Sequence, residues 1–166
     1  EVIHNQAYVL NGVNVSSSVI RSFLQAGEID MATLCLGYSY TLVGKVVHGF
    51  AQGRKMGFPT ANIDTTESGQ LVPAPGVYAV KVKIENTVTL LHGMMNIGMR
   101  PTFDGSKLTL EVNIFNFQGD LYGKQLQVVF IHRIREERKF NNALELAEQL
   151  QKDRLQIEEQ FKKEIE

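Results

Sequence analysis

The chain has 166 residues, of which 43% are hydrophobic and 21% charged, so it is expected to form one domain with at most a small appendage. Its 17 lysines and arginines are balanced by 18 aspartates and glutamates, and the resulting net charge of -1 provides no general field that would attract a polyanion. The composition therefore disfavours nucleic acid binding and leaves open only a local basic patch.

The sequence predicts no membrane segment. No apolar run approaches the roughly 20 residues that a spanning helix requires. The first residues also lack the basic stretch and apolar core of a secretory signal. The single cysteine, Cys35, cannot form an internal disulfide, so the cysteine content gives no indication of an oxidising compartment. We therefore expect a cytoplasmic protein.

Residues 1–37 differ in pattern from the rest of the chain. Short strand-like pieces within residues 8–15 precede serines at 16–18, whose hydroxyls can cap the start of a helix. Apolar residues with helical spacing follow, Gly27 interrupts them, and a second helical stretch ends at Gly37. Because two short helices have too little apolar surface to stand alone, we interpret this segment as an appendage or as the tail of an upstream domain.

From Thr41 onward the pattern changes to short runs of β-branched residues separated by Gly, Pro, Asn and Asp. Within one run, apolar residues alternate with Lys81 and Lys83, as expected of a half-buried antiparallel strand. No helical pattern separates the runs, which favours a closed antiparallel barrel or a sandwich over a parallel α/β sheet. The predicted strands cover residues 42–48, 77–84, 88–92, 108–117 and 126–132.

A long helix is predicted at the C-terminus, with Asn142 as its N-cap and Glu145 at the reciprocal capping position. The charged side chains of this helix, Asp153 among them, are expected to form a solvated face. Its apolar face comprises Ala143, Leu146, Ala147, Leu150, Ile157 and Phe161.

A glycine-rich loop at residues 49–57 is the first candidate for chemistry. Gly49 and Gly53 allow backbone amides to approach a ligand closely, and Lys55 adds a cation, a combination that suits a polyphosphate. A Walker P-loop is excluded, because the loop has no Gly-Lys-Ser/Thr sequence and Pro59 prevents a helix from following it. From composition alone, a flexible hairpin loop explains the segment better.

Thr60 and Asn62 lie two residues apart, so both side chains point to the same face of an extended segment. A hydroxyl and an amide carbonyl are hard neutral oxygens. They suit a Mg²⁺ ion that keeps several waters and takes its remaining ligands from substrate phosphates. By itself, a Thr-x-Asn sequence is explained more readily by turn capping.

Glu111 lies in a predicted strand whose other face is apolar. A solvent-exposed face rarely carries two phenylalanines, so the Glu111 face is expected to line something. A carboxylate there can accept a proton from a substrate hydroxyl, although an exposed strand face accounts for Glu111 equally well. The residues that share its face are Thr109, Asn113, Phe115 and Phe117.

Two further segments combine turn residues with groups that can contact ligands. Residues 96–103 are predicted to form a tight turn that ends in an aromatic residue. Residues 135–140 are predicted to lead from the last strand into the C-terminal helix. Arg135 and Phe140 can hold a planar aromatic ligand by hydrogen bonding and stacking, but an ordinary surface role explains an isolated arginine before a helix better.

Taken together and in this order, the motifs resemble those of riboflavin kinases, from residue 38 to about residue 160. The resemblance implies a mainly β fold, a six-stranded antiparallel Greek-key barrel with a long C-terminal helix, in which ATP and riboflavin meet at one end. The motifs that carry it are GFPTAN at 57–62, NIGMRPTF at 96–103, LEV at 110–112, LYGK at 121–124 and REERKF at 135–140.

The resemblance also implies roles for individual residues. Glu111 would be the catalytic base. The Mg²⁺ that accompanies ATP would be held by Thr60 and Asn62. The flavin would be contacted by Arg135, Arg138 and Phe140. ATP would be bound by Gly49, Gly53, Lys55, Thr60, Asn62 and Tyr122.

Residues 1–37 resemble the end of the FMN adenylyltransferase module that precedes the kinase in bacterial bifunctional enzymes, through the sequence VSSSVIR at 15–21. The nucleotide-binding strand and phosphate loop of that module are absent. The expected division is therefore an adenylyltransferase remnant at 1–37 and a riboflavin kinase domain at 38–166. No adenylyltransferase activity is expected of this chain.

Two other functions compete with a riboflavin kinase that makes FMN and ADP from riboflavin and ATP. A flavin-binding barrel without kinase activity accounts for the aromatic face and Arg135, but it leaves Thr60 and Asn62 unexplained. A barrel that binds RNA would need a basic surface with exposed aromatics, and the balanced charge argues against it.

Overall fold

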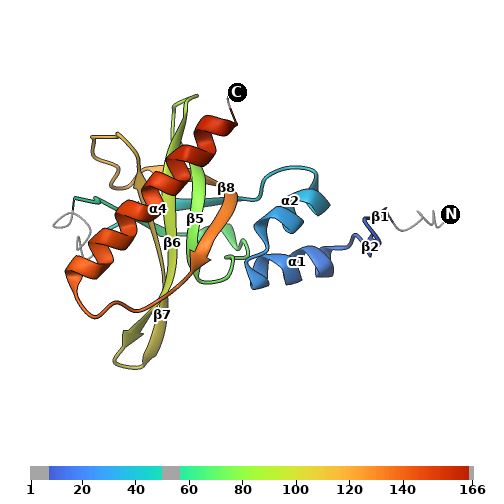
Figure 1. Cartoon of the computed structure of the whole chain (residues 1–166), viewed down its shortest axis with the longest axis horizontal. Coiled ribbons are helices and arrows are strands. Elements are labelled where there is room, and N and C mark those ends of the chain that lie inside the picture. Colours follow the sequence, from blue (N-terminus) through green and yellow to red (C-terminus); the bar gives the residue numbers. More distant parts are fainter. Residues whose placement is uncertain (1–7, 50–56, 165–166) are drawn as a thin grey trace.

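A computed structural model describes residues 8–49 and 57–164 of the chain. In this part of the protein, six antiparallel strands close into a barrel in the order β3-β4-β7-β6-β5-β8 (Figure 1). The connections from β4 to β5 and from β7 to β8 cross over between strands that are not neighbours, as in a Greek key. The strands are β3 (Thr41–Val47), β4 (Ala61–Asp64), β5 (Gly76–Ile84), β6 (Leu90–Thr102), β7 (Gly105–Ile114) and β8 (Gln125–Glu136).

The inside of the barrel is filled by alternate residues of every strand. On β5, Val80, Val82 and Ile84 are buried, whereas the intervening Lys81 and Lys83 are half-buried, as the sequence predicted. The rings of Tyr78 and Phe130 pack edge to face in this core, with centroids 5.2 Å apart. Side chains thus fill the middle of the barrel.

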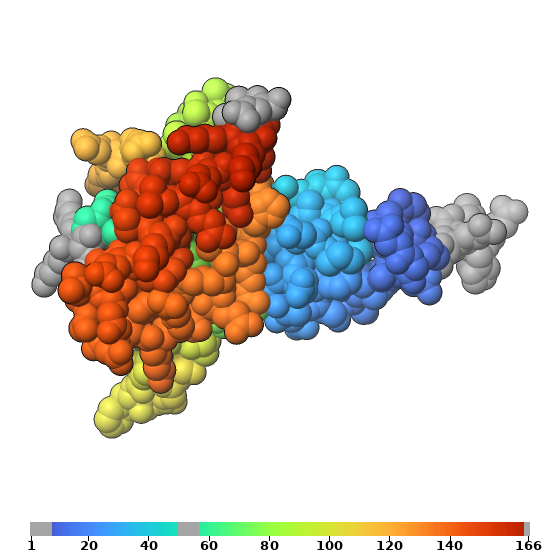
Figure 2. Space-filling view, viewed as in Figure 1, coloured from blue at the N-terminus to red at the C-terminus, as the bar shows by residue number. Residues whose placement is uncertain are grey.

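Helix α4 (Ala143–Lys163) lies along the outside of the barrel and covers part of its surface (Figures 1 and 2). The side chain of Asn142 accepts a hydrogen bond from the Glu145 amide at 2.9 Å, which confirms the predicted cap. The Glu145 carboxylate reaches back to the amide of Asn141, one residue before the expected position. A second apolar cluster forms between helix and barrel, from Phe58, Val77, Ala79, Met94, Phe115, Ile157 and Phe161.

The appendage consists of a hairpin, β1 (Val9–Leu10) and β2 (Val13–Asn14), followed by α1 (Ser17–Ala26) and α2 (Ile29–Leu36). Ser16 caps α1, and Gly27 and Gly37 end the two helices with φ near +80°, a conformation that glycine adopts without strain. The appendage forms a lobe beside the barrel (Figure 2).

Both helices of the appendage are anchored to the barrel. Leu24, Ile29 and Ala32 are buried in the same cluster as the barrel core. On β8, Arg133 donates hydrogen bonds to the carbonyls of Ala26 and Pro75 and so ties the end of α1 to the strand. The appendage is therefore packed into the domain that it precedes.

The prediction of a tight turn at residues 96–103 was wrong. Strand β6 continues through this segment to Thr102, because β7 pairs with it along its length from Gly93 to Thr102. Beyond Ile97 the strand has no partner on its β5 side, so Pro101 lies on an edge, where a missing N–H is tolerated. The strand predicted at 88–92 is only the first part of β6.

Strand β8 also extends further than predicted, to Glu136, so Arg135 belongs to a strand and not to a connecting segment. Among the described helices, none is long and apolar enough to cross a membrane.

Candidate active site

One row of side chains crosses the outside of the barrel and brings the predicted site residues together. The strand registers pair Asn62 of β4 with Glu111 of β7, and Glu111 with Asn96 of β6. They continue the row from Asn96 to Val77 of β5, and from Val77 to Arg135 of β8. Since directly paired residues point to the same face of a sheet, all five side chains lie on the outer surface. Strands β4, β7, β6 and β8 thus align polar groups from distant parts of the sequence, and β5 contributes the apolar Val77.

Thr60 lies immediately before β4, and its hydroxyl donates a hydrogen bond of 3.3 Å to the carboxylate of Glu111. Asn113, two residues after Glu111 on the same face, is 4% exposed and donates a bond of 2.7 Å to the carbonyl of Pro59. This bond fixes the backbone next to Thr60 against β7. The alternation of β7 predicted that Asn113 shares the Glu111 face, but nothing in the sequence indicated which group it would bind.

Two cavities meet at Thr60. The first, which we call the β4 cavity, has a volume of about 310 Å³ and contains Thr60, Asn62, Gly49 and Tyr122 in its lining. The second, which we call the α4 cavity, has a volume of about 320 Å³ and lies between β6, β7 and α4. It is lined by Thr60 and Glu111 on one side and by Arg135, Arg138 and Phe140 on the other. Thr60 therefore lies at the boundary between the two cavities.

In the β4 cavity the structure brings together Gly49, Asn62 and Tyr122. A Cβ atom at Gly49 would overlap the side-chain amide of Asn62, so the close approach of these residues requires glycine. The ring of Tyr122 is half-exposed and stacks on His48, with centroids 3.8 Å apart and planes 24° from parallel. No sequence motif had indicated His48 as part of the site. The predicted ATP-binding residues Gly53 and Lys55 lie outside the described residues.

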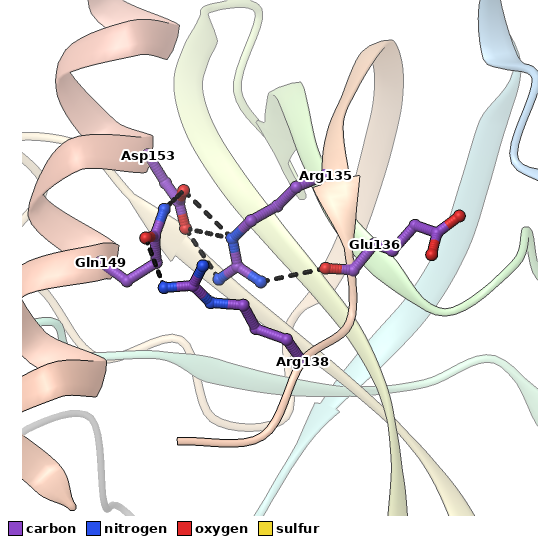
Figure 3. Close-up of polar contacts among 5 residues, drawn as sticks. All are labelled: Arg135, Glu136, Arg138, Gln149 and Asp153. Carbon is purple, nitrogen blue, oxygen red and sulfur yellow. Dashed lines mark hydrogen bonds and ion pairs between the residues drawn. The ribbon is translucent and has the colours of Figure 1, made fainter. Parts of the chain in front are cut away.

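In the α4 cavity, Arg135 is held by a carboxylate that was expected to be solvated (Figure 3). Asp153 of α4 is 1% exposed, and its oxygens accept bonds of 2.9 and 3.1 Å from Nε of Arg135 and contact Nη2 at 2.8 Å. The prediction of a solvated Asp153 was wrong, because the arginine of β8 compensates its charge inside the helix–barrel interface.

A glutamine extends this network to the second predicted arginine (Figure 3). Gln149 donates a bond of 2.6 Å to Asp153 and accepts one of 2.7 Å from Arg138. The guanidinium of Arg138 also lies 4.7 Å from the centroid of the Phe140 ring, and that of Arg135 lies 5.6 Å from it. The structure thus assembles the three predicted flavin contacts at one end of the α4 cavity.

Candidate metal donors are limited in kind. In the described ranges, no group of three His, Cys, Asp or Glu side chains is placed to hold a metal ion. The hydroxyl of Thr60 and the amide of Asn62 both line the β4 cavity, and neutral oxygens of this kind suit Mg²⁺ when phosphate supplies the remaining ligands. The donor set therefore fits the ion that the sequence predicted.

A family model described as riboflavin kinase matches residues 36–161 of the chain. The chain belongs to the riboflavin kinase family. The bifunctional riboflavin kinase/FMN adenylyltransferase of Bacillus subtilis is 43% identical over 143 residues, which cover 84% of this chain and 44% of that relative. The enzyme of the same description from Escherichia coli strain K12 is 38% identical over 161 residues, which cover 97% of this chain and 50% of the relative.

The chain thus spans about half the length of these curated relatives of the riboflavin kinase family. A solved structure described as a macrolide-efflux protein from Streptococcus pneumoniae is also similar, with a TM-score of 0.82 and 36% sequence identity. The similarity covers 89% of this chain and 48% of that one.

Proposed function

We propose that this protein is a riboflavin kinase, which transfers the γ-phosphate of ATP to the terminal hydroxyl of the ribityl chain and releases FMN and ADP. The observation that carries the proposal is the hydrogen bond between Thr60 and Glu111 at the point where the two cavities meet. In this proposal Glu111 is the proton acceptor for the hydroxyl substrate, and its neighbour Thr60 would contact the phosphates.

Phosphoryl transfer requires mainly that the two substrates are aligned and that negative charge is neutralised. In this proposal the ribityl hydroxyl oxygen forms a bond to the γ-phosphorus while the bond from that phosphorus to the bridging oxygen of ADP breaks. The carboxylate of Glu111 accepts the proton of the hydroxyl. No covalent bond to the protein is needed, and Thr60 keeps the carboxylate oriented.

The β4 cavity would bind ATP, with its phosphates near Thr60 and Asn62 and its other end toward Tyr122. Gly49 contributes an unobstructed backbone, and Gly53 and Lys55 are proposed as further phosphate contacts. Thr60 and Asn62 would hold Mg²⁺ together with ATP, and the ion would supply positive charge to the phosphate oxygens.

The α4 cavity would bind riboflavin, with the ribityl chain toward Glu111 and the ring toward Arg135, Arg138 and Phe140. Arg138 and Phe140 would contact the flavin directly. Because the guanidinium of Arg135 is already bonded to Asp153, its contribution would come from its remaining N–H groups. The volume of this cavity lies at the lower end of the range typical of small-molecule sites.

Residues 1–37 are proposed to be the C-terminal part of an FMN adenylyltransferase module, which the longer relatives carry by name. In a longer chain the kinase domain would then begin at residue 38, and the product FMN would be the substrate of the preceding module.

The test is to incubate the protein with riboflavin, ATP and Mg²⁺ and to measure FMN and ADP by chromatography. The proposal predicts that both appear in equal amounts and that neither appears without Mg²⁺. A protein that quenches riboflavin fluorescence but leaves ATP intact would be a flavin-binding barrel, and the kinase proposal would be wrong.

A further inference from the structure

Among the polar residues in the row from Asn62 to Arg135, only Asn96 has no role implied by the sequence motifs. It lies between Glu111 and Val77 in the strand registers, and its inward-pointing neighbours Met95 and Ile97 are buried. Its side chain is therefore directed outward, into the lining of the α4 cavity. Directly paired residues have Cβ atoms about 5 Å apart, so the side chains of Asn96 and Glu111 leave the sheet next to each other, with Asn96 on the side toward Arg135.

The amide of Asn96 is half-buried and has no hydrogen-bond partner within residues 8–49 and 57–164. Two nearby asparagines use their side chains to hold the fold: Asn113 donates to the carbonyl of Pro59, although its Oδ1 has no partner, and Asn142 caps α4. An asparagine side chain offers a carbonyl acceptor and an NH₂ group with two donors. A hydroxyl group, which both donates and accepts, is complementary to such a pair.

We infer that Asn96 binds a hydroxyl of the ribityl chain other than the one that is phosphorylated, and that it selects for a polyol substrate. The inference rests on the proposed function. A chain that lies along the row has its terminal hydroxyl at Glu111 and its ring near Phe140, so its internal hydroxyls pass Asn96. A substrate without them leaves the amide unpaired in the occupied cavity, which weakens binding and productive alignment.

The inference is tested by comparing two substrates on two proteins. The substrates are riboflavin and a flavin whose side chain is a hydroxypentyl group, which keeps the terminal hydroxyl and lacks the internal ones. The parent protein is expected to prefer riboflavin in kcat/KM. In Asn96→Ala that preference should fall by about 3- to 10-fold, the value of one neutral hydrogen bond, because riboflavin loses the contact and the analogue has none to lose. Asn96→Ser keeps a hydroxyl that can still form a hydrogen bond, so its preference for riboflavin should lie between that of the parent and that of Asn96→Ala.

A purely structural role for Asn96 would reduce turnover of both substrates by the same factor and leave the preference unchanged, which would overturn the inference. Asn14→Ala is the matched control, because Asn14 is exposed on β2, outside both cavities. If the parent phosphorylates neither flavin, the proposed function fails. The same comparison is then made with dissociation constants from flavin fluorescence, and an equal preference in parent and Asn96→Ala again rules against Asn96.

Discussion

Replacing Asp153 by alanine would leave the guanidinium of Arg135 without its carboxylate in the interface between α4 and the barrel. Asp153 is 1% exposed and accepts bonds from both Arg135 and Gln149. Loss of one partner from a buried ion pair typically costs about 3 to 5 kcal/mol, because the other charge stays buried. The side chain of Arg135 is 18% exposed, so water can partly replace the carboxylate. We therefore expect Asp153→Ala to lower the free energy of unfolding by about 3 kcal/mol.

For a protein of this length, each kcal/mol lowers the melting temperature by about 2–4 °C, so Asp153→Ala should melt roughly 6–12 °C below the parent. The assay is thermal and urea unfolding followed by circular dichroism. Asp30→Ala is the matched control: Asp30 also pairs with a β8 residue, His132, at 2.7 Å, but its side chain is 71% exposed. An exposed pair contributes about 1 kcal/mol or less, so this variant should stay close to the parent.

If Asp153→Ala and Asp30→Ala are destabilised equally, the buried pair does not hold α4 to the barrel and the reasoning fails. A double variant separates the charge effect from the loss of packing. Asp153→Leu combined with Arg135→Met removes both charges and keeps apolar volume, so it should recover most of the stability that Asp153→Ala loses.

Three other predictions concern the site, the appendage and His92 of β6, whose ring stacks on Phe161 near the end of α4. Glu111→Gln should lower kcat by about 10² to 10⁴-fold with little change in riboflavin binding, and turnover close to that of the parent would rule out Glu111 as the base. A chain that begins at Gly37 should keep kinase activity but unfold at lower urea concentration, because Leu24 and Ile29 no longer cover the barrel core; a folded but inactive product would contradict this. Burial, with a smaller effect of Lys81, lowers the pKa of His92 below its usual value near 6.5. The folded state thus favours neutral His92. The stability that this contributes is lost as the pH falls from about 6.5 through the lowered pKa. The melting temperature of His92→Gln should therefore depend less on pH over that range than the melting temperature of the parent.

The strands of the barrel could be predicted from the sequence where a local pattern alone determines which residues are buried. On β5, apolar residues at every second position meet the requirement that one strand face is buried, and this holds whatever strands pair with it. Strand β6 is the opposite case. Its glycine and proline residues indicate a turn. Pairing with β7 from Gly93 to Thr102 instead provides hydrogen-bond partners for the backbone N–H and C=O groups and keeps the strand extended. A local pattern does not reveal which neighbours a strand will have.

The same distinction explains the outcome at the site. Thr60 and Glu111 are 51 positions apart, so their hydrogen bond depends on the register of β4 against β7, which the motifs alone do not specify. The buried Asp153 did leave a local signal. It lies three positions after Leu150 and four before Ile157, within the apolar stripe of the helix. A carboxylate in such a stripe requires a buried cation, and Arg135 was available in the segment predicted to follow the last strand.

The two halves of the proposed site therefore depend on different parts of the fold. The Thr60 and Glu111 half is positioned by strand pairing and by the bond from Asn113 to Pro59, all within the barrel. The Arg135 and Arg138 half depends on α4, because Asp153 and Gln149 hold both guanidinium groups from the helix. Displacement of α4 would disrupt the proposed flavin contacts and leave the proposed catalytic pair in place. The helix that covers the outer apolar cluster is also the element that aligns the proposed flavin side of the site.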